Sequence, residues 1–123
     1  MPAKSPEEMN DLFEKAMNSA GVEALVALYE PEGVLVASPD QVATGHDAIR
    51  EALGAYLAGK PQLTMEAGPI QVVGDIALSV HGWKMKIEGP DGPSELKGTA
   101  AEVMRRQPDG TWLFVVDNPF AGE

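Results

Sequence analysis

The order of two sequence patterns constrains the fold of this 123-residue chain more than any other feature. Up to Pro61, apolar residues recur at the three- and four-residue spacing of amphipathic helices. After Pro61, turns rich in glycine and proline separate strand-like segments. Because helices come first and a meander of strands follows, the sequence predicts an α+β domain. The helices should pack on one face of a curved, mainly antiparallel sheet.

Three helices are predicted in the first half of the chain. Capping and stop signals place them at residues 5–21, 22–29 and 44–59, with Thr44 as the N-cap of the third. Residues 34–36 are predicted to form a short strand between the second and third helices.

Four longer strands are predicted in the second half, at residues 63–73, 76–87, 95–106 and 111–117. The connections between them are short turns, so neighbouring strands should run antiparallel.

Composition excludes several classes of function. Nine lysines and arginines stand against nineteen aspartates and glutamates, and the net charge of -10 disfavours binding to nucleic acid or to an anionic membrane. Cysteine is absent, which excludes disulfides and thiolate metal sites. The chain carries no metal-binding spacing and no dinucleotide or phosphate fingerprint, so no metal and no cofactor are expected.

The sequence also predicts where the protein resides. No stretch approaches the length of an apolar membrane span. The N-terminal residues lack the apolar core of a signal peptide, so a cytoplasmic protein is expected.

Two segments carry a family resemblance. One is Thr44-Gly45-His46-Asp47-Ala48-Ile49-Arg50, and the other is Val103-Met104-Arg105-Arg106-Gln107-Pro108-Asp109-Gly110-Thr111-Trp112. With residues 13–29 and 74–78, they make the chain resemble the nuclear-transport-factor-2-like superfamily, in particular its SnoaL-like and ketosteroid-isomerase-like bacterial members. The resemblance implies one domain, residues 1–123, in which three N-terminal helices and a strongly curved sheet form a cone around an apolar pocket.

The resemblance also implies a homodimer formed through the outer face of the sheet. The last predicted strand agrees with this, because Trp112-Leu113-Phe114-Val115-Val116 is apolar on both faces. Neither face can simply be exposed to water. We therefore expect one face to cover the helices and the pocket, and the other to contact a second copy of the chain.

The resemblance to ketosteroid isomerases assigns three catalytic roles. A tyrosine on the first helix and a protonated acid on a late strand form an oxyanion hole, and an aspartate on the first strand is the base. Here the tyrosine position is Phe13 and the base position falls on or near Ala37, so neither residue can perform its role. The late-strand acid falls on Glu102, which remains chemically competent. Steroid isomerisation by that mechanism is therefore not expected.

Asp117, at the end of the last predicted strand, is a second candidate carboxylate. Related cyclases and epoxide hydrolases place an acid–base aspartate in this region of the fold. Strand alternation predicts that Asp117 shares a face with Leu113 and Val115. If that face lines the pocket, burial would raise the pKa of Asp117 and suit it to acid–base catalysis. Alternatively, Asp117 accepts backbone hydrogen bonds where the strand ends.

His81 is the third candidate catalytic residue. Alternation places it with Ser79, Trp83 and Met85 on one face of a long strand. A histidine in a pocket could move a proton or orient a ligand carbonyl, beside a ligand wall made by Trp83 and Met85. The alternative is a histidine of the core or of an interface. Four further residues are expected to contact a ligand: Phe13, Met17, Tyr56 and Val115.

Tyr29 and Tyr56 are the only tyrosines of the chain. Each is predicted at a core-facing position of a helix. Either hydroxyl could reach the cavity, but hydrophobic packing is the expected role of both.

These residues support two hypotheses of function. The first is a cofactor-independent isomerase, cyclase or lyase that binds a small apolar carbonyl compound, with Asp117 or Glu102 handling the proton and His81 orienting the substrate. The second is a non-catalytic ligand-binding or dimerisation module of the same fold, which the loss of function at Phe13 and Ala37 favours.

Overall fold

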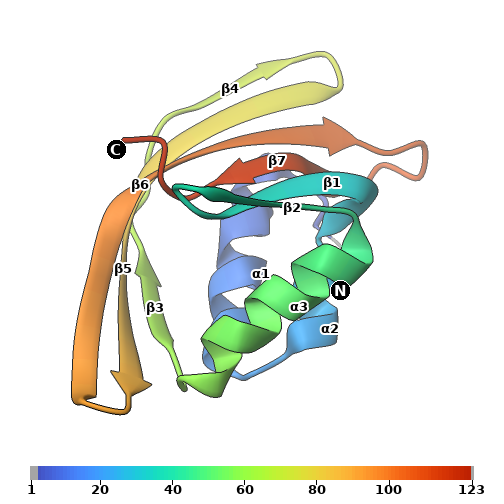
Figure 1. The fold of residues 1–123 in the computed structure, drawn as a ribbon. Helices are drawn as coiled ribbons and strands as arrows, with labels where there is room; N and C mark the ends of the chain where they lie inside the picture. The colour runs from blue at the N-terminus through green and yellow to red at the C-terminus, as the bar shows by residue number, and fades with distance from the viewer. Residues whose placement is uncertain (1–2, 123) are drawn as a thin grey trace.

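Three helices pack against one face of a single curved sheet in the computed structural model, which describes residues 3–122 (Figure 1). The seven strands of this part of the chain follow the order β2-β1-β7-β6-β5-β3, and β4 also pairs with β5. All neighbours are antiparallel except β1 and β7. The elements are α1 (Pro6–Asn18), α2 (Val22–Val26), β1 (Tyr29–Ser38), β2 (Gln41–Thr44), α3 (His46–Ala58), β3 (Gln62–Met65), β4 (Ile70–Val73), β5 (Ile76–Gly89), β6 (Gly92–Arg106) and β7 (Trp112–Asn118).

This arrangement confirms the predicted α+β class, with three helices on a curved, mainly antiparallel sheet. The long β5–β6 hairpin bends around the helices and forms one wall of the fold (Figure 1). The buried apolar side chains lie between the helices and the concave face of the sheet. No helix in residues 3–122 is long and apolar enough to cross a membrane.

Helix α1 begins where the sequence predicts. The Ser5 side chain accepts a hydrogen bond from the backbone N–H of Glu8, and Pro6 occupies the first turn. Its apolar stripe is buried against the sheet and includes Met9, Phe13 and Met17.

The second helix is shorter than predicted, and the first strand is longer. Helix α2 ends at Val26, and Tyr29 already belongs to β1. Pro31 and Gly33, which follow the predicted end of this helix, lie inside the strand. They are accommodated because the pairing of β1 with β7 is irregular between Tyr29 and Val34, so the missing N–H of Pro31 does not interrupt a regular ladder.

The predicted N-cap of the third helix at Thr44 is wrong. Thr44 ends strand β2, a short strand that sequence analysis did not predict, and Gly45 is the N-cap of α3. Gly45 has a φ of 87°, a conformation that glycine adopts without steric cost. It lets the chain pass directly from the β1–β2 hairpin into the helix.

The single strand predicted at residues 63–73 is two strands, β3 and β4, both paired with β5. Gly68 lies in the break between them, where its backbone lies tightly against β5. A Cβ atom on Gly68 would overlap the carbonyl oxygen of Val80. The break is closed by hydrogen bonds from Glu66 N to Gly82 O (2.9 Å) and from Val80 N to Pro69 O (3.2 Å).

Strand β7 contains a bulge that alternation could not predict. Its register with β6 pairs Phe114 with Met104 and Val116 with Val103, so Val115 is the extra residue. The bulge changes the inward and outward positions beyond it. Asp117 therefore shares the buried face with Phe114, and the prediction that it shares a face with Leu113 and Val115 is wrong.

We predict opposite effects for two glycine-to-alanine substitutions. Gly68→Ala should lower the free energy of unfolding by about 1–3 kcal/mol, because the backbone of β5 must shift to admit the methyl group. Gly54→Ala, inside α3 with open space around it, should raise that free energy by about 0.5–1 kcal/mol. Urea denaturation measures both. Equal effects of the two substitutions would contradict the close approach at Gly68.

Candidate active site

A cavity of ≈ 60 Å³ lies between the helices and the concave face of the sheet. Its walls are mostly apolar. Of the candidate residues from the sequence, the following line it: Phe13, Met17, Tyr56, His81, Trp83, Met85, Glu102 and Asp117. Val115 is not among the lining residues. It is the extra, unpaired residue of the β7 bulge, and the next residue of β7 that points into the cavity is Asp117.

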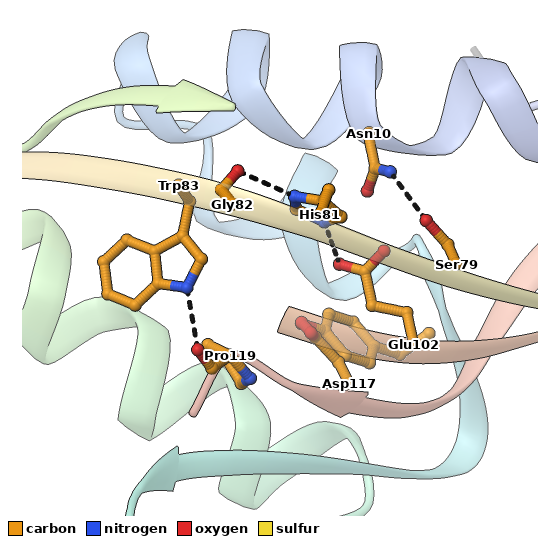
Figure 2. A network of polar contacts seen from close by, with 9 residues as sticks. Asn10, Ser79, His81, Gly82, Trp83, Glu102, Asp117 and Pro119 are labelled. Carbon is orange, nitrogen blue, oxygen red and sulfur yellow. Dashed lines mark hydrogen bonds and ion pairs between the residues drawn. The ribbon is translucent and has the colours of Figure 1, made fainter. Parts of the chain in front are cut away.

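Three neighbouring strands bring the polar candidates together. Glu102 on β6 pairs directly with Asp117 on β7, and His81 on β5 points to the same concave face (Figure 2). The Nε2 atom of His81 lies 3.2 Å from Oε2 of Glu102. Their exposed fractions are 4% for His81, 2% for Glu102 and 2% for Asp117. The site is therefore a cluster of three ionisable groups that water hardly reaches.

His81 is surrounded by hydrogen-bond acceptors. Its Nδ1 atom lies 3.1 Å from the carbonyl oxygen of Gly82, and Nε2 faces the Glu102 carboxylate. Only the doubly protonated imidazolium can donate to both. Burial lowers the pKa of His81, but the hydrogen bond and the negative charge of Glu102 outweigh burial and leave that pKa above its usual value. The arrangement therefore favours an ion pair between His81 and Glu102.

Asp117, in contrast to the charged His81, is held in its neutral form. Burial and the adjacent charge of Glu102 raise the pKa of Asp117 from 3.8 to about 8. The hydroxyl of Tyr29 donates a hydrogen bond to Oδ2 of Asp117 at 2.5 Å, which opposes part of this rise. Asp117 is thus a neutral carboxylic acid near pH 7 and can donate a proton or a hydrogen bond.

Tyr29 is a site residue that the sequence analysis missed. Its burial and the charge of Asp117 raise the pKa of Tyr29 well above its usual value, so its hydroxyl remains a donor. The prediction placed Tyr29 in a helix with a packing role. A local signal was available, because Pro31 disfavours helical backbone at Glu30 and so separates Tyr29 from the helix before it.

The positions that correspond to the missing catalytic roles face the same cavity. Phe13 and Ala37 both line it, but neither has a polar side chain. Tyr56 also lines the cavity, and its hydroxyl donates to the carbonyl oxygen of Ala37 at 2.5 Å. His46 makes its contact elsewhere, with Nε2 2.8 Å from the Tyr29 carbonyl oxygen.

The segment after β7 completes the cavity wall, which the sequence analysis did not predict. Pro119 and Phe120 are lining residues. The indole N–H of Trp83 donates to the carbonyl oxygen of Pro119 at 2.7 Å (Figure 2). The Phe120 ring meets the Trp83 ring edge-on, with 5.8 Å between the ring centroids. Trp83 therefore fixes this segment against the sheet.

The described residues, 3–122, contain no group of three or more histidine, cysteine, aspartate or glutamate side chains placed to hold a metal ion. The polar groups of the cavity, in contrast, are suited to proton transfer. A neutral acid, Asp117, stands beside a carboxylate that is paired with an imidazolium.

The raised pKa of Asp117 predicts a pH dependence of stability. Between pH 3.8 and about pH 8, the folded protein holds a proton on Asp117 that the unfolded chain releases, so the free energy of unfolding falls as pH rises through this range. Asp117→Asn, which imitates the neutral acid, should remove this loss. The melting temperature of the variant should exceed that of the parent by a margin that grows from pH 4 toward pH 8. Exposed Asp11→Asn serves as the control, and a margin independent of pH would contradict the buried acid.

Comparison with solved structures shows the same fold in several proteins of low sequence identity. A Mycobacterium tuberculosis protein of unknown function matches with a TM-score of 0.80 and 18% identity, over 91% of this chain and 66% of that chain. A Streptomyces avermitilis protein proposed to be a dehydratase of the nuclear-transport-factor-2-like family matches with a TM-score of 0.75 and 21% identity, over 91% of this chain and 90% of that one. A Shewanella frigidimarina protein proposed to be a ketosteroid isomerase matches with a TM-score of 0.74 and 18% identity, over 90% of each chain.

No curated protein matches the sequence. The family model of the SnoaL-like domain, however, matches residues 9–115, a stretch that begins within α1 and ends within β7. This match agrees with the resemblance that the sequence motifs carry and with the fold of the solved structures. The chain belongs to the SnoaL-like domain family.

Proposed function

We propose that the protein is a cofactor-independent enzyme that moves a proton within a small apolar carbonyl compound, as an isomerase, cyclase or lyase does. One observation carries the proposal: a neutral carboxylic acid, Asp117, and the Glu102–His81 pair face the same apolar cavity. Apolar walls with a few convergent polar groups are typical of small-molecule sites. Titratable groups with shifted pKa values inside such a cavity are typical of acid–base catalysis.

Asp117 is the proposed acid. The Tyr29 hydroxyl donates a hydrogen bond to Oδ2 of Asp117. The other carboxyl oxygen and its proton therefore remain for the ligand or for Glu102. A hydrogen bond from this neutral acid to a carbonyl oxygen would stabilise the negative charge that develops when a neighbouring carbon loses a proton. Because the site excludes water, this stabilisation is stronger than it would be in solution.

Glu102 is the proposed base. Its carboxylate would accept the proton from the carbon atom. In an isomerase or cyclase it would return this proton to another atom of the same substrate, and in a lyase to the group that leaves when its bond to the neighbouring carbon breaks. His81 orients Glu102 through the 3.2 Å contact and, when protonated, places a positive charge beside it. The roles thus fall on β5, β6 and β7, and not on Phe13 and Ala37, where the ketosteroid-isomerase pattern would place a tyrosine and a base.

The fold neighbours support the same class of chemistry. Dehydratase and ketosteroid isomerase are the activities proposed for two of them, and both reactions involve proton transfer next to an activated carbon. The alternative is a non-catalytic ligand-binding module, which the apolar residues Phe13 and Ala37 favour. Both alternatives require a ligand in the cavity, and they differ in whether the ligand exchanges protons.

Deuterium exchange tests this proposal. A panel of small apolar ketones and enones is incubated with the protein in D2O, and NMR measures deuterium uptake at the carbon next to the carbonyl. We expect uptake with at least one compound, reduced about 10²–10⁴-fold by Glu102→Gln or Asp117→Asn. Glu51→Gln, at an exposed position of α3, should leave the rate unchanged. Compounds that bind without any exchange would support the binding module instead.

We further propose that the partner of the outer sheet face is a second copy of this chain. Val73, Ile76 and Leu78 on β4 and β5 are 79%, 40% and 41% exposed, which is unusual for neighbouring apolar side chains. The same face carries both signs of charge, because Lys86 pairs across the strands with Glu95. A face with apolar residues and both signs of charge can complement itself across a two-fold axis.

Sedimentation velocity tests this dimer. The parent protein should sediment as a dimer at micromolar concentration, and Leu78→Lys should shift it to the monomer because a buried lysine would lack a partner. Val42→Lys, at an apolar position on β2 that is more exposed than Leu78, is the control and should remain dimeric. A parent protein that is monomeric under these conditions would contradict the proposal.

A further inference from the structure

Two buried oxygen atoms near the site have no hydrogen-bond partner within residues 3–122. They are Oε1 of Glu102 and Oδ1 of Asn10. Glu102 uses its other oxygen, Oε2, for His81. Asn10 uses its amide nitrogen, which donates to Oγ of Ser79 at 3.4 Å. Buried acceptors are nearly always satisfied in folded proteins, so these two oxygens indicate a bound donor.

The two oxygens are brought to one place by the fold. Ser79 on β5 pairs directly with Glu102 on β6, and both are buried on the concave face. Asn10 reaches down from α1 and contacts Ser79, so the amide, the hydroxyl and the carboxylate surround the same point (Figure 2).

The chemistry of these groups matches one water molecule. Two acceptors, Oδ1 of Asn10 and Oε1 of Glu102, require two donated protons. The Ser79 hydroxyl already accepts from Asn10, so its own proton is available to donate. A water that donates twice and accepts once makes three hydrogen bonds, the usual number for a buried water. A cation is disfavoured because the His81 imidazole, which the site holds protonated, lies on the other side of the same carboxylate.

We propose that Asn10 and Ser79 hold an ordered water against Oε1 of Glu102, and that this water orients the carboxylate toward His81 and exchanges with solvent. Asn10 and Ser79 are then positioning residues, since they act on Glu102 through the water. The water site itself is independent of the proposed function. Its catalytic consequence, a Glu102 carboxylate oriented to accept a proton, rests on that function.

A second hollow gives the water a route to solvent. Asn10 also lines a groove between α1 and the β3–β4 connection, together with Glu7, Asp11, Glu14 and Glu66. Met65 borders both this groove and the apolar cavity. The water therefore lies between the two hollows. Protons can reach the Glu102–His81 pair from the groove while a ligand fills the cavity.

A high-resolution crystal structure of the parent protein tests the water site directly. We expect one water within hydrogen-bond distance of Glu102 Oε1, Asn10 Oδ1 and Ser79 Oγ. A direct hydrogen bond between Asn10 and Glu102, a cation at this point, or no density there would overturn the proposal. This result does not depend on whether any compound is turned over.

NMR titration of the His81 ring tests the role of the water. Asn10→Leu and Ser79→Ala should each lower the pKa of His81, because Glu102 loses a donor that stabilises its ionised form. Each should also slow the exchange of the His81 Nε2 proton with solvent. The matched controls are Asn18→Leu on the same helix and Ser19→Ala at its end, which lose other hydrogen bonds and should leave both quantities unchanged. Variants that fold and keep the parent pKa and exchange rate would overturn the role of the water.

Discussion

The structure depends on one ion pair, between Glu102 and His81, that is buried away from water. Glu102 and His81 lie 3.2 Å apart beneath the helices, and each satisfies the other. A single buried charge without a partner costs several kcal/mol, on the order of the whole stability margin of a small domain. The regular register of the β5–β6 hairpin places the two side chains on the same face. Because the pair is complete, the helices cover this face without leaving a single buried charge.

The same pair determines the state of its neighbour. Asp117 lies next to an ionised carboxylate in a cavity of low polarity, and a second negative charge there would meet both repulsion and desolvation. Retaining a proton is the less costly state. The protein therefore obtains a neutral acid from the ion pair beside it, with Tyr29 fixing the orientation of the acid. This arrangement lowers stability at neutral pH, as is common where residues are placed for function.

Sequence reasoning succeeded where the local pattern was regular. The start of α1 follows from Ser5 and Pro6, and the face shared by His81, Trp83 and Met85 follows from a long strand without interruption. It failed where the backbone departs from periodicity. The bulge at Val115 depends on pairing with a strand elsewhere in the chain, and the hydrogen bond of Tyr29 joins residues 88 positions apart. The α+β class was predicted from the order of the helix and strand patterns, and the cone-shaped fold through the resemblance of short motifs, which carry little information about chemistry.

The extra residue in β7 also shows how such a site can change during evolution. If Val115 were paired in the ladder instead of bulged, regular alternation would turn Asp117 to the outer face of the sheet and bring Val116 to the cavity. The acid would disappear from the site although no residue had been substituted. In this fold, the formation or loss of a bulge in a strand can therefore switch a cavity between a reactive and an inert lining. Alignments of sequence alone would miss the change.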